Sequence, residues 1–174
     1  MAIDIPDRPA IRQALVEALD DLYVKDIFLL KQELAERAIV GPLYCYLRAR
    51  VGKLCQLHVD TEWDAMTDEK AEQIKKKLQM LAVNGKTGEV YPDIIIHNRP
   101  DSGHNTLVIE VKIDGRGSTK DRNWAMNKLR AFTTPLDQHG RSYRQGCFLD
   151  LGVDHATAEW FEYGHGPSPK DPLR

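Results

Sequence analysis

Two apolar segments near the middle of the chain restrict its fold more than any other feature. Residues 92–97 (PDIIIH) and 106–113 (TLVIEVKI) are rich in β-branched side chains and are bounded by Pro, Asp, Ser and Gly. This composition is typical of short β-strands. The stretch between them, RPDSGHN, has the length of a hairpin loop, so the two strands are predicted to pair in one sheet.

Helical patterns precede this pair of strands. Asp7 and Pro9 suit the start of a helix, and the apolar residues after them recur at helical spacing: Ile11, Leu15, Leu19 and Leu22. A second helix is predicted over residues 27–50. We expect Gly41-Pro42 to kink this helix, because proline lacks a backbone N–H and clashes with the preceding turn.

The other patterns complete a mixed α/β domain. Strands are predicted at residues 54–63, 146–152 and 158–163, and helices at residues 67–80 and 121–132. The predicted order in the core is helix, two or three strands, helix and strand. This order indicates the α/β class, with a central mixed sheet flanked by helices.

Length and composition favour one domain. The chain has 174 residues, of which 42% are hydrophobic, and no repeat or linker rich in Gly and Ser divides it. We therefore predict a single domain over residues 1–174. It would consist of an N-terminal helical addition (1–30), a core (31–152) and a C-terminal strand with a tail (153–174).

Signals for membranes and secretion are not seen. The apolar runs fall far short of the ~20 residues that span a bilayer, and the first residues, MAIDIPDRPA, lack the pattern of a secretory signal. Cys45, Cys55 and Cys147 are too few and too scattered for a disulfide framework. We expect a cytoplasmic protein that does not associate with a membrane.

Charged residues interrupt the second of the two central strands. Glu110 and Lys112 should point to the same face, because side chains alternate along a strand. Both are costly in an apolar strand unless they are paired or bound to something. Asp93 begins the neighbouring strand, so a hairpin would bring its carboxylate towards that of Glu110. Two close carboxylates repel, and a hard divalent cation is the usual compensation.

The chain reads Pro-Asp, sixteen residues, then Glu-Val-Lys between positions 92 and 112. This pattern resembles the signature of the PD-(D/E)xK nuclease superfamily, which includes many restriction endonucleases and Holliday-junction resolvases. The predicted αβββαβ order is similar to that family's core and covers roughly residues 31–152. The resemblance implies a restriction-endonuclease-like fold with an extra N-terminal helix. It also implies a metal-dependent nuclease that hydrolyses phosphodiester bonds, with DNA endonuclease activity as the main expectation.

The resemblance assigns roles to residues by their position. Asp93 and Glu110 would bind Mg²⁺ or Mn²⁺, and the backbone carbonyl of Val111 would be a further ligand. Lys112 would orient or activate the attacking water and offset charge at the phosphate. Phosphodiester cleavage needs an in-line nucleophile and neutralisation of negative charge, which a metal and an ammonium group both supply.

Two glutamates could complete the catalytic site. Many family members use a glutamate from the first core helix, the place that Glu36 takes here, and Glu62 on the preceding predicted strand is a second candidate. Ordinary roles stand beside these: Glu36 could pair with Arg37 on a helix surface, and Glu62 could be a solvated strand-end residue. Glu110 and Lys112 could likewise form a salt bridge on an edge strand.

The distribution of charge bears on the expected partner. The formal net charge of −2 argues against binding nucleic acid by bulk charge, but residues 112–144 carry eight bases against three acids. Four of these bases follow the proposed catalytic strand, where the phosphates of DNA would pass: Lys120, Arg122, Lys128 and Arg130. A solvated helix face is the alternative. Cutting both strands often needs two sites, so the resemblance is also compatible with a homodimer.

Other functions fit the sequence less well. His97 and His104 have the wrong spacing for an HNH-type nuclease, and Cys45, Cys55 and His58 lack a fourth ligand for zinc. The main rival hypothesis is a noncatalytic module that keeps the nuclease fold and binds nucleic acid or a protein partner. Intact Asp, Glu and Lys residues speak against a degraded site, but their geometry decides between the two hypotheses.

Overall fold

The computed structural model describes residues 7–54, 56–61, 91–98, 105–135 and 142–174. Four helices lie in these ranges: α1 (Arg8–Lys25), α2 (Ile27–Lys31), α3 (Glu36–Leu54) and α5 (Thr119–Thr133). The strands there are β1 (His58–Thr61), β2 (Ile94–His97), β3 (Leu107–Ile113), β4 (Gln145–Leu151), β5 (Ala156–Phe161) and β6 (Asp171–Pro172). The α/β class is confirmed.

The strands form one mixed sheet in the order β1-β2-β3-β4-β5-β6. β3 and β4 are parallel, and every other neighbouring pair is antiparallel. The parallel pair is joined by α5, as parallel strands require a long crossover. The antiparallel pairing of β2 with β3, predicted from the two central segments, is confirmed.

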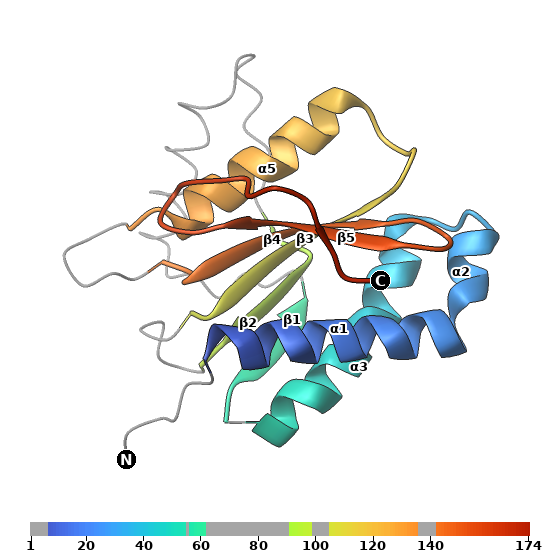
Figure 1. The fold of residues 1–174 in the computed structure, drawn as a ribbon, viewed down its shortest axis with the longest axis horizontal. Coiled ribbons are helices and arrows are strands. Elements are labelled where there is room, and N and C mark those ends of the chain that lie inside the picture. Colours follow the sequence, from blue (N-terminus) through green and yellow to red (C-terminus); the bar gives the residue numbers. More distant parts are fainter. Residues whose placement is uncertain (1–6, 55, 62–90, 99–104, 136–141) are drawn as a thin grey trace.

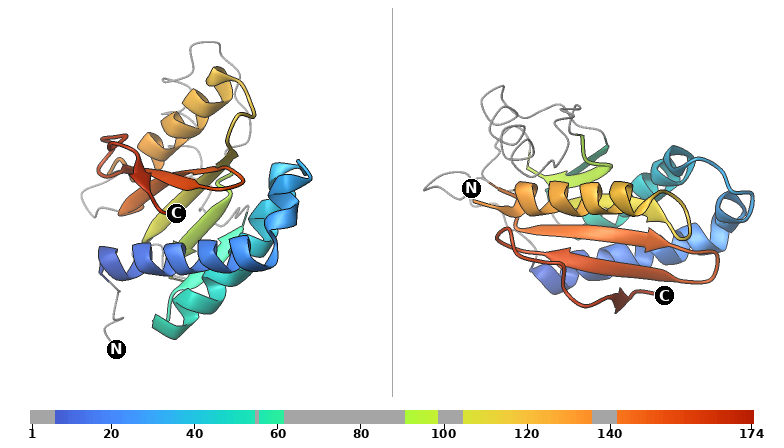
Figure 2. Two further views of the ribbon diagram at one scale, coloured as in Figure 1. Left: turned by 45° about the vertical axis from the view of Figure 1, so that its right-hand side comes forward. Right: turned by 90° about the horizontal axis from the view of Figure 1, so that it is seen from above.

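Helices cover both faces of the sheet, which makes three layers (Figure 1). On one face α1, α2 and α3 enclose the larger core, and on the other face α5 packs over a smaller one. Figure 2 shows α5 and the α1–α3 pair on opposite sides of the strands. Ile109 and Val111 of β3 belong to the larger core, whereas Val108 belongs to the α5 side. Glu110 alternates with Ile109 and Val111 and therefore faces α5.

Most predicted elements agree with the structure, within a few residues at their ends. The Asp7 side chain accepts a hydrogen bond from the Ala10 backbone N–H at 2.9 Å and caps α1, as its position before Pro9 predicts. α5 begins with a capping box, in which Ser118 and Asp121 satisfy each other's backbone N–H groups. The predicted helix at residues 67–80 lies outside the described residues.

The prediction of one helix over residues 27–50 is wrong. The helix ends at Lys31 and a new one starts at Glu36, whereas α3 continues past Pro42. Glu33 adopts a left-handed φ of 56°, and the Leu34 N–H reaches back to the Leu29 carbonyl at 3.3 Å. This is a Schellman-type helix end, which usually has glycine at the left-handed position. The break places Glu36 in the first turn of α3.

No helix among the described residues is long and apolar enough to cross a membrane.

Candidate active site

The two acidic residues of the signature lie close together at one end of the β2–β3 pair. Asp93 directly precedes β2, whose first residue, Ile94, pairs with Ile109. Glu110 follows Ile109 on β3 and is close enough to Asp93 for the charge of Asp93 to raise its pKa. Asp93 is half-buried, and its Oδ2 accepts a hydrogen bond from the Val111 N–H at 2.7 Å. The approach of the two carboxyl-bearing residues, expected from a hairpin, is present.

Glu110 is a buried carboxyl group with one unsatisfied oxygen. Its side chain is 1% exposed, and its Oε2 lies 2.5 Å from the Lys128 Nζ. Its Oε1 has no hydrogen-bond partner in the described part of the chain. Burial raises the pKa of Glu110 to about 8; Lys128 opposes this shift, and the charge of Asp93 adds to it. A buried polar atom without a partner is costly, so Oε1 is suited to an added ligand.

Lys112 pairs with Glu36 and not with Glu110. Its Nζ lies 2.8 Å and 3.0 Å from the two carboxylate oxygens of Glu36, at the start of α3. Burial lowers the pKa of Lys112, but the hydrogen bond and charge of Glu36 outweigh burial and hold it above 10.5. Lys112 is therefore an ammonium group at neutral pH. Glu110 contacts Lys128 instead, so the salt bridge between Glu110 and Lys112 on an edge strand does not form among the described residues.

The Val111 backbone faces the gap beside Asp93. Its N–H points towards Asp93, and the N–H and C=O of one strand residue point to the same side. In the register of β2 and β3, Pro92 would be opposite Val111, and proline has no N–H to donate. The Val111 carbonyl is thus on the same edge as its N–H, towards Asp93, and the resemblance assigns this carbonyl a ligand role.

The four basic residues assigned to nucleic acid differ in their surroundings. Lys120 is exposed at the start of α5. Arg130 donates to the Gly166 carbonyl at 3.1 Å and lies over the Phe161 ring. Arg122 bonds Asp150 on β4, and Lys128 contacts Glu110. Only Lys120 of the four therefore lies in open solvent, while the other three have partners within the protein.

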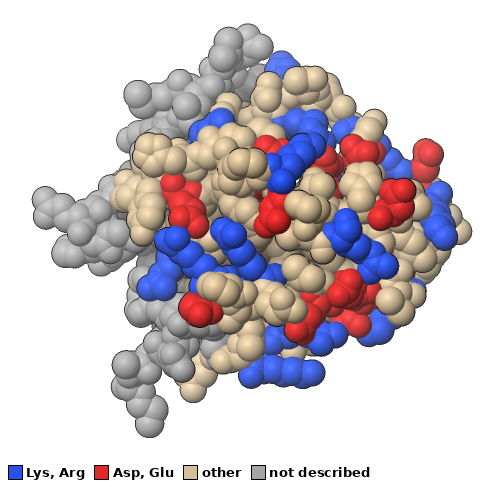
Figure 3. All heavy atoms as spheres, in the orientation of Figure 1, with Lys and Arg blue, Asp and Glu red and all other residues tan. Residues whose placement is uncertain are grey.

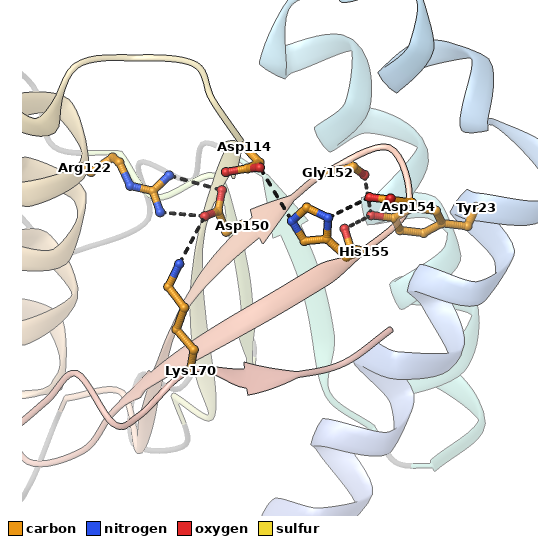
Figure 4. Close-up of polar contacts among 8 residues, drawn as sticks. All are labelled: Tyr23, Asp114, Arg122, Asp150, Gly152, Asp154, His155 and Lys170. Carbon is orange, nitrogen blue, oxygen red and sulfur yellow. Dashed lines mark hydrogen bonds and ion pairs between the residues drawn. The ribbon is translucent and has the colours of Figure 1, made fainter.

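A second polar cluster, around Asp150 on β4, includes Arg122 and Lys170 (Figure 4). Asp150 is opposite Lys112 in the parallel register, is 4% exposed, and accepts both Nη groups of Arg122 at 3.1 Å and 2.6 Å. Lys170 approaches the same carboxylate at 3.9 Å. Sequence reasoning missed Asp150, although it carries the same signal as Glu110: a single acidic residue in an apolar strand, GCFLDLG.

Histidines elsewhere have local partners. The His155 Nδ1 lies 2.8 Å from Asp154, and its Nε2 lies 3.6 Å from Asp114, as Figure 4 shows. The His97 Nε2 lies 2.7 Å from the Asp60 carboxylate. His104, Cys55 and Glu62 lie outside the described residues.

The residues that could hold a metal are few. In the described ranges, no group of three or more His, Cys, Asp and Glu side chains is arranged to bind a metal ion. Of the residues in the signature, Asp93 and Glu110 supply the carboxyl groups that could bind a metal. Glu36 instead accepts a hydrogen bond from Lys112. A divalent cation would fit this pair because Glu110 Oε1 is buried and has no partner in the described part of the chain, and backbone or water oxygens would complete the metal's shell.

Comparisons with family models, curated proteins and solved structures give no match to this chain. On the face shown in Figure 3, acidic and basic side chains are interspersed rather than separated into patches.

Proposed function

We propose that the chain is a metal-dependent nuclease of the PD-(D/E)xK type, which hydrolyses phosphodiester bonds in DNA and acts as an endonuclease. The observation that carries the proposal is the Glu110 carboxyl group, which is buried, lacks a partner at Oε1 among the described residues and lies near the charge of Asp93. A restriction-endonuclease-like fold is part of the proposal. It is supported by the order α3, β1, β2, β3, α5, β4 among the described elements.

Asp93, Glu110 and the Val111 carbonyl would hold Mg²⁺ or Mn²⁺. Hard divalent cations prefer oxygen ligands, and this set offers only oxygens. The bound ion would supply charge neutralisation at the phosphate and lower the pKa of a coordinated water. The contact between Asp93 and the Val111 N–H fixes one of these carboxylates before any metal binds.

Lys112 would act as a fixed positive charge. Its raised pKa keeps the proton on Nζ at neutral pH, so the group donates hydrogen bonds and cannot accept a proton from water. Lys112 is thus suited to orient water and to stabilise the charge that develops on the phosphate. Glu36 contacts Lys112 with both carboxylate oxygens and would position the ammonium group.

One observation favours a noncatalytic module as the second candidate. Glu110 already has Lys128 as a counter-ion, and Lys112 already has Glu36. Two internal ion pairs neutralise much of the charge that a metal and a phosphate would otherwise have to neutralise. A protein that kept this fold only to bind nucleic acid or a protein partner could retain such pairs.

A cleavage assay separates the two candidates. The purified full chain is incubated with supercoiled plasmid and with linear DNA, in Mg²⁺, Mn²⁺ or EDTA. Asp93→Asn and Lys112→Met test the site, and the exposed residues Asp154 and Lys53 supply matched controls as D154N and K53M. We expect nicking that needs metal and falls at least ~100-fold in both site variants, with wild-type rates in the controls. Metal-independent cleavage, or full activity in both site variants, contradicts the proposal.

A further inference from the structure

Lys128 connects the two segments that carry the acidic residues. This lysine projects from α5, and its side chain is only 13% exposed. Its Nζ lies 2.5 Å from the Glu110 Oε2 and donates to the Tyr91 backbone carbonyl at 3.3 Å. Tyr91 is two residues before Asp93 on the chain entering β2. One ammonium group therefore contacts both the β3 carboxyl group and the segment that leads to the second one.

The helix that carries Lys128 is firmly attached to the sheet. Leu129 and Phe132 are buried in the core beneath α5, and Ala125 lies one turn before them. The capping box at Ser118 secures the beginning of the helix. A long side chain from a fixed helix loses much of its rotamer freedom when its end is bound. The position of the Lys128 side chain is thus set by the packing of α5 and not by the conformation of a loop.

The contact with Lys128 gives the two carboxyl oxygens of Glu110 different surroundings. Oε2 is engaged by Lys128, whereas Oε1 has no hydrogen-bond partner in the described residues. A carboxyl group held by one oxygen cannot rotate without leaving the largely buried Lys128 ammonium group without this partner, and an unpartnered buried donor is costly. Residues that hold a metal ligand in this way are known to affect metal affinity strongly.

We propose that Lys128 is a positioning residue, which orients Glu110 and sets the spacing between the Glu110 and Asp93 segments. This inference depends on the proposed metal-dependent function. It changes the role predicted for Lys128 from sequence, which was contact with nucleic acid. The residue acts through Glu110 and the Tyr91 carbonyl, whereas the exposed Lys120 on the same helix keeps its predicted role as a phosphate contact.

Titration of the full chain with MnCl₂ by calorimetry tests this role without substrate. We expect Lys128→Met to weaken Mn²⁺ binding by about 10- to 100-fold, the usual effect of removing a group that supports a ligand. Lys128→Gln, which keeps a hydrogen-bond donor, should bind Mn²⁺ with an affinity between those of the wild type and Lys128→Met. K53M should bind as the wild type does. In cleavage, the Mg²⁺ concentration for half-maximal rate should rise in K128M while kcat at saturating Mg²⁺ stays within about threefold.

The outcomes separate this inference from the function on which it depends. If the wild type neither binds Mn²⁺ nor cleaves DNA, both fail. If the wild type binds Mn²⁺ and folded K128M binds it equally well, only the positioning role fails. Tighter binding by K128M also overturns it, because the ammonium would then merely compete with the metal. Should K128M not fold, K128Q makes the same comparison, with unchanged affinity as the contradicting result.

Discussion

Lys112 and Glu36 meet across the end of the sheet, 76 positions apart in sequence, with both Glu36 oxygens within 3.0 Å of the ammonium nitrogen. The contact joins the strand that carries the nuclease-like signature to the first turn of α3. It exists because the chain breaks at Glu33 and restarts at Glu36. The resemblance offers Glu36 as part of the catalytic site, and its contact with Lys112 makes it a counter-ion for that lysine.

Glu36→Gln should therefore lower the pKa of Lys112, because burial remains while the opposing charge is lost. We expect kcat for DNA cleavage to fall about tenfold and the alkaline limb of the pH–rate profile to move to lower pH. Mn²⁺ affinity should stay unchanged. Exposed Glu33 provides the control as E33Q. A large loss of Mn²⁺ affinity in E36Q would instead make Glu36 a metal ligand.

Glu110 should make the stability of the metal-free protein depend on pH. Its carboxyl pKa rises from 4.5 to about 8 on folding, mainly through burial. Its contribution to stability is complete below about pH 4.5 and is lost as the pH rises through 8. Relative to Glu110→Gln, the wild type should lose on the order of a few kcal/mol of unfolding free energy over this range. Urea unfolding in EDTA at several pH values measures the difference, and parallel stability curves for the two proteins would contradict it.

The strands were predictable because their signals are local. β-Branched residues, bounded by Pro, Asp, Ser and Gly, mark β2 and β3. The hairpin between these strands brings Asp93 near Glu110. The helix break was not predictable, because Glu33 adopts a left-handed conformation that sequence rules assign to glycine or asparagine. Pro42, the obvious breaker, lies inside α3 instead.

The ion-pair partners could not be predicted for a different reason. Sequence proximity pairs Glu110 with Lys112, but each contacts a partner on a helix instead: Glu110 contacts Lys128 of α5, and Lys112 contacts Glu36 of α3. These partners depend on how α3 and α5 pack against the sheet. The sequence around a charged helix residue does not indicate which residue it will contact. Asp150 is the exception: a lone acid in a buried strand signals a partner, although it does not say which.

Asp150→Asn should destabilise the fold by about 3 kcal/mol, the usual cost of breaking a buried ion pair from one side. The change leaves Arg122 without its two-point partner, above the Phe148 ring. Urea unfolding provides the measurement, and Asp114→Asn, at an exposed position, is the control. In a double-mutant cycle, adding Arg122→Met to D150N should restore part of the lost free energy of unfolding. A change below about 0.5 kcal/mol in D150N, typical of surface sites, would show that the pair contributes little.

Lys120→Ala should weaken DNA binding to a similar degree for all sequences, since an exposed lysine at this position would contact phosphate and not a base. Each lost phosphate contact lowers the slope of log affinity against log salt by about 1. Fluorescence anisotropy with labelled duplex in Ca²⁺, across a salt series, measures both quantities. Lys53→Ala, on exposed α3 surface, should leave both unchanged. An unchanged salt slope in K120A, with wild-type affinity, would place the DNA on another face of the protein.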